Sequence, residues 1–324
     1  MPAASFEEKV VLITGGAGYL GSALTRALAG TSCRIILLTH ESDPQPVPTG
    51  ASAEISVIKG DIGDSETWSD ALRGVDYVFH LAAQTSAYLA NQDPLMDFDT
   101  NVLPVMRLVE NCERQSRPPD ILFAGTVTQV GVPSRVPVDE TFQDHPVTVY
   151  DIHKLMAEKY LQLHCHETGG RAATLRLANV YGPGPASSRS DRGILNQMVR
   201  KGLNGETLTV YGDGDAVRDY IFVDAVAQAF LAAAGHMDRV TGGYYVIGSG
   251  VGWRIVDAIN LAADRVRQMT GDMPEVKHVP PPDGLSPIED RNFVADTTRF
   301  RQATGWESKV SLADGIDRLI DHFR

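Results

Sequence analysis

The chain has 324 residues, of which 43% are hydrophobic and 22% are charged, and this composition is typical of a globular protein. Its length predicts one large domain with a smaller appended one. The formal net charge of -12 argues against a nucleic-acid partner, because binding that backbone needs a surplus of Lys and Arg. A small anionic ligand remains compatible, since helix N-termini and a few arginines can bind a phosphate locally.

The three cysteines, Cys33, Cys112 and Cys165, are widely spaced and odd in number. Neither a disulfide framework nor a metal site is therefore expected. The first residues lack the basic and apolar regions of a signal peptide, and no apolar run is long enough to span a membrane. These features predict a cytoplasmic protein without a membrane partner.

In the first half of the chain, short apolar runs alternate with amphipathic segments. Strands are expected at 10–14, 34–38, 55–59, 77–81, 121–124 and 174–177, and helices at 19–29, 65–72, 101–115 and 150–166. This alternation predicts βαβ units, and the continuous apolar strands predict a parallel sheet covered on both faces. The expected fold class is α/β, with a doubly wound parallel sheet over residues 1–181.

After Asn179 the pattern loosens. Residues 181–193 are rich in Gly, Pro and Ser, so we expect a loop that leaves the sheet. Residues 182–219 and 249–324 are predicted to form a smaller C-terminal substrate domain. Residues 220–248 are predicted to return to the sheet through a helix at 224–234 and a strand at 244–247.

A glycine-rich segment, TGGAGYLGS, follows the first predicted strand and opens the first predicted helix. Side chains at Gly15, Gly18 and Gly21 would block the turn, the approach of a pyrophosphate or the packing of the helix on the strand. The alternative is an ordinary βα turn. Its position directly between a strand and a helix favours a dinucleotide site.

The end of the second predicted strand bears on the choice of cofactor. An acidic residue there binds the ribose 2′-hydroxyl of NAD, but this chain has Thr39 and His40. The sequence thus leans to NADP(H), with His40 as a candidate phosphate contact, while the nearby Glu41 leaves NAD(H) possible. Asp61, after the third strand, is a candidate acceptor for the adenine amino group or a helix cap.

Tyr150 and Lys154 lie four residues apart at the start of a predicted helix, so they share one face. An ammonium beside a phenol favours the phenolate, and such a tyrosine can exchange a proton with a carbinol oxygen. Thr126, in the loop after 121–124, is placed to hydrogen-bond the reacting oxygen. An exposed helical pair is the alternative.

Seven segments together resemble the extended short-chain dehydrogenase/reductase family of NAD-dependent epimerase/dehydratase type, over nearly the whole chain. They are TGGAGYLGS at 14–22, GDI at 60–62, HLAA at 80–83, Asn101, YDIHK at 150–154, LRLANVYGP at 175–183 and RDYIFVDA at 218–225. The resemblance implies a Rossmann fold and a nucleotide-diphosphate sugar as substrate.

The resemblance also implies roles for individual residues. Thr126, Tyr150 and Lys154 would be catalytic. Thr126, Asn179, Arg218 and Arg291 would contact the substrate, and guanidinium groups suit its diphosphate. The alternatives to substrate binding are that Asn179 is a turn residue and that the two arginines form surface ion pairs. The implied cofactor contacts are Gly15, Gly18, Tyr19, Leu20, Gly21, Thr39, His40, Asp61, Ile62, Leu81, Ala82, Ala83, Asn101, Tyr150 and Lys154.

Within the family, dehydratases carry Asp-Glu directly after the catalytic threonine. Val127 and Thr128 stand there in this chain and cannot shuttle protons as carboxylates do, which argues against dehydration. Residues 191–225 and 289–296 resemble nucleotide-diphospho-4-keto-6-deoxyhexose 4-ketoreductases, so NAD(P)H-dependent reduction of a 4-keto-deoxysugar is the preferred function. A nucleotide-sugar 4-epimerase with tightly bound NAD is the alternative. A non-catalytic dinucleotide sensor is less expected, because it would not need Thr126, Tyr150 and Lys154.

Relatives in this family commonly dimerise through two helices per subunit. Here these would be 101–115 and 150–166. The second has apolar residues at Leu155, Met156, Tyr160, Leu161 and Leu163. A homodimer is therefore expected, and packing of this helix on its own sheet is the alternative.

Overall fold

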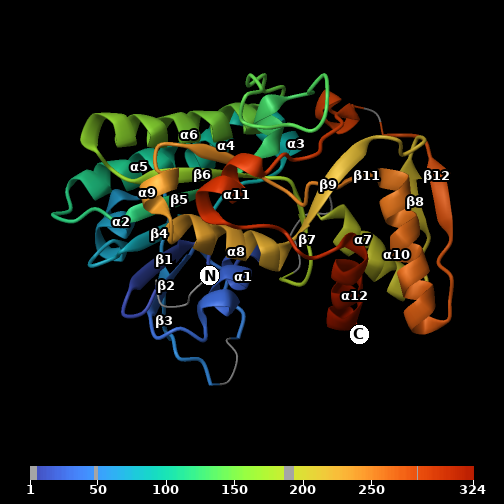
Figure 1. The fold of residues 1–324 in the computed structure, drawn as a ribbon, viewed down its shortest axis with the longest axis horizontal. Helices are drawn as coiled ribbons and strands as arrows, with labels where there is room; N and C mark the ends of the chain where they lie inside the picture. Colours follow the sequence, from blue (N-terminus) through green and yellow to red (C-terminus); the bar gives the residue numbers. More distant parts are fainter. Residues whose placement is uncertain (1–5, 47–49, 186–192, 283) are drawn as a thin grey trace.

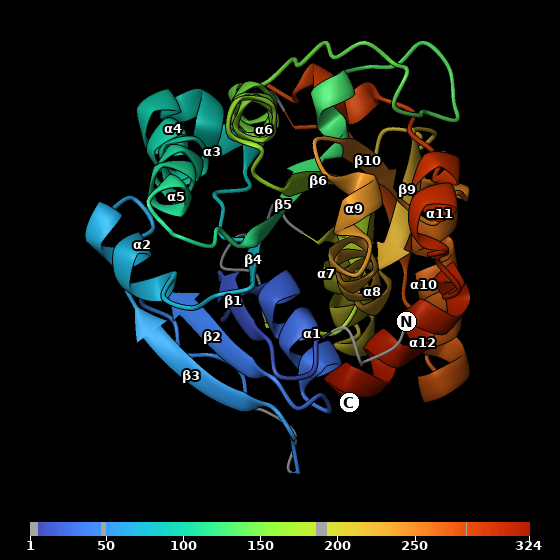
Figure 2. The same ribbon diagram turned by 60° about the vertical axis from the view of Figure 1, so that its left-hand side comes forward.

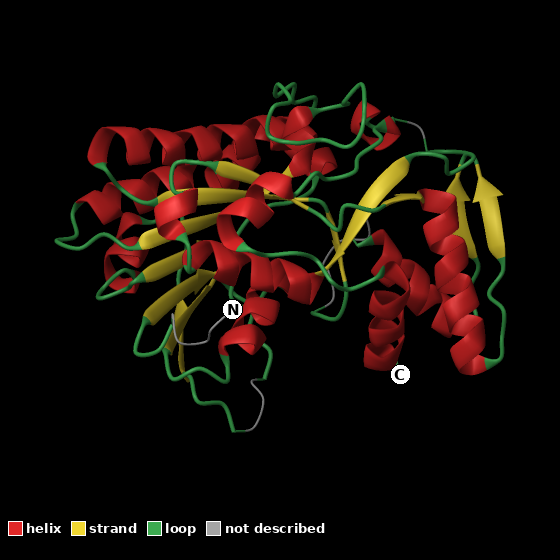
Figure 3. Cartoon of the chain, viewed as in Figure 1, coloured by secondary structure: helices red, strands yellow, loops and turns green. Residues whose placement is uncertain are grey.

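A parallel seven-stranded sheet forms the centre of the computed structural model, which describes residues 6–46, 50–185, 193–282 and 284–324 (Figures 1 and 3). The strand order is β10-β6-β5-β4-β1-β2-β3, and all neighbours run parallel. The strands are β1 Val10–Thr14, β2 Arg34–Thr39, β3 Glu54–Lys59, β4 Tyr77–His80, β5 Asp120–Thr126, β6 Ala172–Leu177 and β10 Tyr244–Ile247. The predicted doubly wound α/β sheet is thus confirmed.

Helices cover both faces of this sheet (Figure 2). On one face lie α1 (Tyr19–Leu28) and α8 (Val223–Ala234), and on the other lie α2 (Ser65–Ala71), α5 (Leu103–Glu113) and α6 (Val149–Thr168). In β1, Ile13 belongs to the core under α1 and α8, while Leu12 belongs to the core under α2 and α5. Because both faces are buried, these strands are apolar without alternation.

The direction in which successive strands are added to the sheet reverses beside β1. The chain first runs from β1 out to β3, and then crosses to β4 on the other side of β1. In open α/β sheets, the loops at the carboxyl ends of strands separate at such a point and leave a crevice for a ligand. The predicted dinucleotide site follows β1, so it lies at this reversal.

The helix predicted at 101–115 is confirmed as α5, which begins and ends two residues inside those bounds. The sequence did not predict α3 (Ala87–Gln92) and α4 (Pro94–Asn101), which precede α5 and are separated from it by a break at Val102. Pro104 has no amide hydrogen to donate to the carbonyl one turn earlier, and the backbone at Val102 has a φ of -107°. Asn101 therefore ends a helix that the sequence did not predict.

The C-terminal half adds two small sheets at the right of Figure 1. One has the order β11-β9-β7, and the other pairs β12 with β8. The elements of this half are β7 Asn179–Tyr181, α7 Ile194–Leu203, β8 Leu208–Tyr211, β9 Val217–Phe222, α9 Met237–Val240, β11 Gly252–Arg254, α10 Ile255–Thr270, β12 Val276–Val279, the short 3-10 helix η3 Pro287–Asp290, α11 Thr298–Thr304 and α12 Leu312–Phe323. A second short 3-10 helix, η2 (Val127–Val130), directly follows β5 in the first half of the chain.

Two parts of the predicted C-terminal organisation can be placed. Within 220–248, α8 packs on α1 and β10 pairs with β6, whereas residues 220–222 belong to β9 and pair with β7. Of the loop predicted at 181–193, residues 186–192 lie outside the described residues. Among the helices that are described, none combines the length and the apolar character needed to cross a membrane.

Candidate active site

The glycine-rich turn between β1 and α1 forms a close-fitting cradle. Gly15 has a φ of +65°, and a Cβ there would lie 3.0 Å from the backbone of Ala82. A Cβ on Gly18 would lie 3.0 Å from the carbonyl oxygen of Gly15, and one on Gly21 only 2.3 Å from it. Only glycine fits this geometry, which leaves the N-terminus of α1 open to an anion.

The loops beside this turn are fixed by one hydroxyl group. Thr14 Oγ1 accepts hydrogen bonds from the amides of Leu81 and Ala82, both at 3.1 Å, and lies 2.8 Å from His80 Nδ1. Burial, with a contribution from Lys154, lowers the pKa of His80 to about 3, so the ring is neutral. Leu81, Ala82 and the half-buried Ala83 thus line the crevice at the ends of β1 and β4.

The residues predicted to face the adenosine end lie at the ends of the next two strands. Thr39 is buried at the end of β2, and its hydroxyl has no partner among the described residues. His40 is exposed. Asp61, after β3, accepts a hydrogen bond from Gly63 N at 2.8 Å, and the carbonyl of Ile62 accepts one from Trp68 Nε1. Asp61 therefore stabilises its own turn.

Tyr19 and Leu20 begin α1, directly after the turn. The Tyr19 hydroxyl donates to the carbonyl oxygen of Gly182 at 2.5 Å and accepts from Asn196 Nδ2 at 3.3 Å. Burial raises the pKa of Tyr19 above its usual value. This tyrosine ties the dinucleotide side of the molecule to the loop after β7. Leu20, half-buried, packs against the core under α1.

Asn101 belongs to a buried polar network around Asp97. One oxygen of Asp97 accepts from Gln84 Nε2 at 2.6 Å and from Asn101 Nδ2 at 2.9 Å, and the other lies 2.7 Å from His153 Nδ1. Asn101 Nδ2 also donates to the carbonyl of Gln84, while its side-chain oxygen has no partner among the described residues. That unpaired acceptor fits a site that an added ligand completes.

Thr126, Tyr150 and Lys154 are brought to the same region from two elements. Thr126 ends β5, and Tyr150 and Lys154 lie on successive turns at the start of α6, which packs on β5. Tyr150 is half-buried, while Lys154 is 2% exposed. Their arrangement can support proton exchange by a phenol beside an ammonium.

Lys154 is held in an unusual environment for a cation. Its Nζ lies 4.1 Å from the centroid of the Phe123 ring, which gives a cation–π contact. Burial lowers the pKa of Lys154 to about 7, although Asp97 and Glu158 oppose the shift. The ammonium is therefore partly deprotonated near neutral pH, before any ligand adds charge to the site.

Asn179, Arg218 and Arg291 come together around the small sheet. Asn179 in β7 pairs with Tyr220, two residues after Arg218 in β9, and its buried side-chain oxygen has no partner among the described residues. Arg218 donates to the carbonyl oxygens of Arg291 and Glu289, the latter at 2.6 Å. Arg291 donates to the carbonyl oxygen of Ile288 at 2.7 Å.

The two arginines form a buried positive centre. Arg218 is 3% exposed and Arg291 is 7% exposed. Burial, and then the nearby Arg218, lower the pKa of Arg291 to about 10. The Nε of Arg291 has no partner among the described residues. Asp219 accepts from Ser249, Gly250 and Ala295, and Asp215 pairs with Arg254, so neither of them pairs with Arg218, which instead lies 3.5 Å from a carboxylate oxygen of Glu289. Two buried guanidinium groups are suited to a diphosphate.

One residue of this region was not predicted. Asp151, next to Tyr150, is 1% exposed and accepts hydrogen bonds from Thr128 and Thr148. Burial raises the pKa of Asp151. The sequence offered a weak signal, because an acidic residue in the first turn of a helix is commonly a capping residue.

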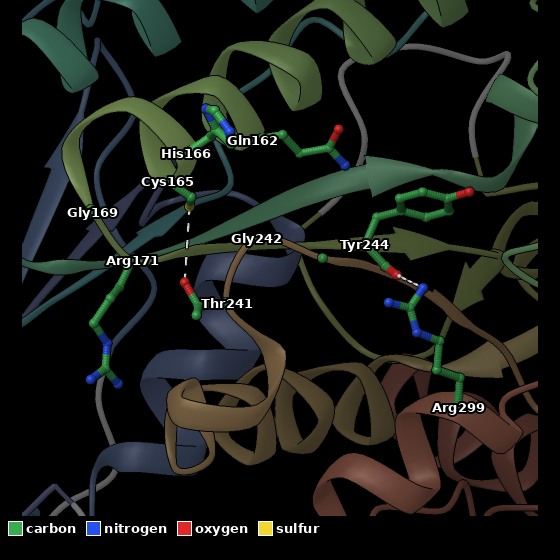
Figure 4. Close-up of a pocket in the computed structure, with 11 residues that line it drawn as sticks. Gln162, Cys165, His166, Gly169, Arg171, Thr241, Gly242, Tyr244 and Arg299 are labelled. Atoms are coloured by element: carbon green, nitrogen blue, oxygen red, sulfur yellow. Dashed lines mark hydrogen bonds between the residues drawn. The ribbon is translucent and has the colours of Figure 1, made fainter.

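A depression in the surface lies away from these residues. It has a volume of about 670 Å³ and lies beside the amino ends of β6 and β10, where Cys165, Thr241 and Arg299 line it (Figure 4). Thr126, Tyr150 and Arg218 do not line it. Because ligands of open α/β sheets bind at the carboxyl ends of the strands, this depression is not the candidate active site.

Comparison with known proteins decides the family. Residues 11–248 match the NAD dependent epimerase/dehydratase family. The chain belongs to this family. Its curated relatives include the UDP-glucose 4-epimerase of Mycolicibacterium smegmatis, 29% identical with 97% of this chain and 98% of the relative covered. They also include the dTDP-4-dehydro-6-deoxyglucose reductase of Escherichia coli, 26% identical with 97% of each chain covered.

Solved structures agree with this assignment. The UDP-glucose 4-epimerase of Thermotoga maritima with UDP-glucose has a TM-score of 0.85 at 30% identity, covering 97% of this chain and 98% of the other. That of Thermus thermophilus with NAD has a TM-score of 0.83 at 30% identity and the same coverage. The chain is thus an enzyme of the short-chain dehydrogenase/reductase type, from a family of nucleotide-sugar epimerases and reductases, and its cofactor is a nicotinamide dinucleotide. The resemblance drawn from the motifs is confirmed.

Proposed function

We propose that this enzyme reduces the 4-keto group of a nucleotide-diphospho-4-keto-6-deoxysugar. The observation that carries this choice is the end of β2, where Thr39 and His40 offer no carboxylate to the ribose 2′-hydroxyl. A carboxylate would repel a 2′-phosphate, so this end of the site is compatible with NADP(H), a cofactor that is consumed and released. The reductase of Escherichia coli is a relative over nearly the whole chain.

The chain's own residues would hold a dinucleotide at the reversal beside β1. Gly15, Gly18 and Gly21 leave space that a Cβ would fill, and Asn101 presents an unpaired side-chain oxygen. When bound, the nicotinamide supplies or accepts a hydride. Lys154 lies one turn after Tyr150 on α6, and in its protonated form it would favour transfer of a proton between the phenol and the C4 oxygen. Thr126 would hydrogen-bond that oxygen.

The substrate diphosphate would lie against Arg218, Arg291 and Asn179. Both guanidinium groups are buried and donate chiefly to backbone carbonyls, and Arg218 also lies 3.5 Å from a carboxylate oxygen of Glu289. An anionic ligand would stabilise them. The residues therefore fit the nucleotide-diphosphate part of the substrate better than its sugar.

A nucleotide-sugar 4-epimerase is the second candidate. It is supported by the relatives that are 29 and 30% identical, which are UDP-glucose 4-epimerases. Both functions use Thr126, Tyr150 and Lys154 in the same way. They differ in whether the dinucleotide leaves after each turnover.

We also propose a homodimer in a reducing compartment such as the cytoplasm. The outer side of α6 carries Ile152, Tyr160 and Leu163, which are 44, 36 and 53% exposed, whereas Leu161 is buried against the sheet. A second α6 would cover this apolar strip. All three cysteines are free thiols. Light scattering that gives the mass of a single chain would refute the dimer.

The test begins with the purified protein. Denaturation followed by mass spectrometry should release little dinucleotide, and NADPH should bind more tightly than NADH. Oxidation of NADPH in the presence of dTDP-4-keto-6-deoxyglucose should then be measurable at 340 nm. Stoichiometric NAD, together with interconversion of UDP-glucose and UDP-galactose, would instead establish the epimerase.

Tyr150→Phe separates an enzyme from a sensor in the same assay. We expect turnover to fall by at least a hundredfold, because the phenylalanine ring cannot transfer a proton. The dissociation constant of NADPH should change less than threefold. Unchanged turnover would exclude this tyrosine as the acid or base.

A further inference from the structure

A buried carboxyl group that the proposed reaction does not use lies close to Thr126. Asp151 is in the first turn of α6, directly after Tyr150, and is 1% exposed. One carboxylate oxygen accepts a hydrogen bond from Thr148 Oγ1 at 2.7 Å, and the other accepts one from Thr128 Oγ1. Both oxygens are therefore engaged, by the cap of α6 on one side and by η2 on the other.

The bond to Thr128 continues to Thr126. The hydroxyl oxygens of Thr128 and Thr126 are 2.8 Å apart, and the amide of Thr128 donates to Thr126 Oγ1 at 3.3 Å. A continuous chain of side-chain contacts thus joins Asp151, Thr128 and Thr126. It links the start of α6, which carries Tyr150, to the end of β5.

The backbone of Thr126 is fixed separately. Its amide donates to Gln129 Oε1 at 3.1 Å, and Gln129 Nε2 lies 3.3 Å from a carboxylate oxygen of the buried Glu158. This contact holds the backbone of the threonine and does not involve its hydroxyl. The chain through Thr128 is the described contact that fixes the hydroxyl.

In the dehydratases that the motifs resemble, the two residues after the threonine are Asp-Glu, whereas Val127 and Thr128 stand here. Thr128 does not itself supply a carboxylate. Its hydroxyl instead reaches the carboxylate of Asp151 on the neighbouring helix.

We propose that Asp151 is a positioning residue that acts through Thr128 to hold the Thr126 hydroxyl toward the reacting oxygen. Thr128 gives its one proton to Asp151, so Thr126 is the donor in the contact between the two hydroxyls, and this contact aligns the Thr126 hydroxyl until a bound C4 oxygen takes its proton. The loss of one partner therefore disturbs the others. The inference rests on the proposed hydride transfer at this site. It applies equally to a reductase and to an epimerase.

The decisive variants change Thr128, the middle residue of the hydrogen-bonded series from Asp151 to Thr126. Thr128→Val keeps the shape of the side chain and deletes its hydroxyl, while Thr128→Ser keeps the hydroxyl. The matched control is Thr304→Val, which deletes a buried hydroxyl bonded to the carbonyl of Phe300 in α11. Wild type and variants are assayed with dTDP-4-keto-6-deoxyglucose and NADPH, and with UDP-glucose and NAD.

We expect Thr128→Val to lower kcat about tenfold, while KM and the dissociation constant of NADPH change less than twofold. Thr128→Ser should retain at least half of kcat, and Thr304→Val should lower the melting temperature without changing kcat. A merely structural role would move the melting temperature and leave kcat intact. Full kcat in Thr128→Val would overturn the inference.

Asp151→Asn keeps the packing and provides a second route if Thr128→Val does not fold. It should also lower kcat, and the double variant should lose no more than the larger single loss, because both changes break one chain. Additive losses of kcat would contradict the proposal that Asp151 acts through Thr128. Absence of turnover in wild type with both substrates would refute the proposed function itself, which is a different outcome from active wild type with unaffected variants.

Discussion

The glycine-rich turn after β1 and the arginine pair in the C-terminal half are both expected to face a diphosphate, yet they are built from different chemistry. The turn offers backbone amides at the N-terminus of α1, and its selectivity comes from the space that three missing side chains leave. The pair offers buried guanidinium groups that lie 73 residues apart in the chain. The first kind of site is local, and the second exists only after folding.

This difference predicts which kind of substitution would disrupt each site. The turn fails when an atom is added, because the added Cβ meets backbone that cannot move away. The arginine pair fails when a donor is removed or reshaped, because its charge and its planar geometry bind the anion. Four substitutions test this contrast, from the largest expected effect to the smallest.

Gly21→Ala should have the largest effect. Its Cβ would lie 2.3 Å from the carbonyl oxygen of Gly15, so the turn must open. We expect the dissociation constant of NADPH, measured by fluorescence titration, to rise at least a hundredfold. Gly30→Ala is the matched control, since nothing lies within 4 Å of a Cβ there. Equal affinities in both variants would show that the turn does not bind the dinucleotide.

Lys154→Met tests the buried cation of the dinucleotide side, which lies apart from the arginine pair. Burial lowers the pKa of Lys154 from 10.5 to about 7, so between these values the unfolded chain binds more protons than the folded one. Between these two pKa values, this group should therefore increase the free energy of unfolding of the wild type as the pH rises. Below pH 7 the buried charge costs on the order of a few kcal/mol.

Urea unfolding at pH 6.5 and pH 9.5 measures the difference. Lys154→Met should be the more stable protein at pH 6.5, and its advantage should shrink at pH 9.5. Lys159→Met, on the exposed side of α6, should show no such pH dependence. A constant gap between Lys154→Met and wild type would mean that Lys154 is not desolvated in solution.

Arg291→Lys preserves the charge but removes the planar fork. We expect KM for the nucleotide sugar to rise about tenfold, with little change in the affinity for NADPH, because a lysine is a point charge that cannot bind two phosphate oxygens in parallel. Arg301→Lys, an exposed residue paired with Glu307, is the control. If Arg291→Lys changed the affinity for NADPH and left KM unchanged, Arg291 would contact the cofactor and not the substrate.

Thr148→Ala should have the smallest effect. Its hydroxyl caps α6 by accepting from Asp151 N at 3.2 Å, and loss of such a cap costs about 1 kcal/mol. Thermal unfolding should show a melting temperature lowered by a few degrees, on the order expected for that energy. An unchanged melting temperature would mean that Asp151 alone stabilises the start of the helix.

The sequence predicted best what depends on neighbours in the chain. It gave β1 and β10 with the observed bounds and placed the glycines, because hydrophobic period and the lack of a Cβ are local properties. It missed α3 and α4 and the break at Val102 that separates α4 from α5. The spacing of Tyr150 and Lys154 was visible in the same way, but the burial of Lys154 over Phe123 was not.

By itself, the sequence determined the parallel sheet, the cradle after β1 and the family, since each is written in short contiguous segments. Only the tertiary structure joined Arg218 to Arg291, Asp97 to His153, and Asp151 to Thr126 through Thr128. Such contacts link separate elements, and hydrogen bonds are directional over a few ångströms. No pattern along the chain specifies them until the sheet and its helices have set those elements side by side.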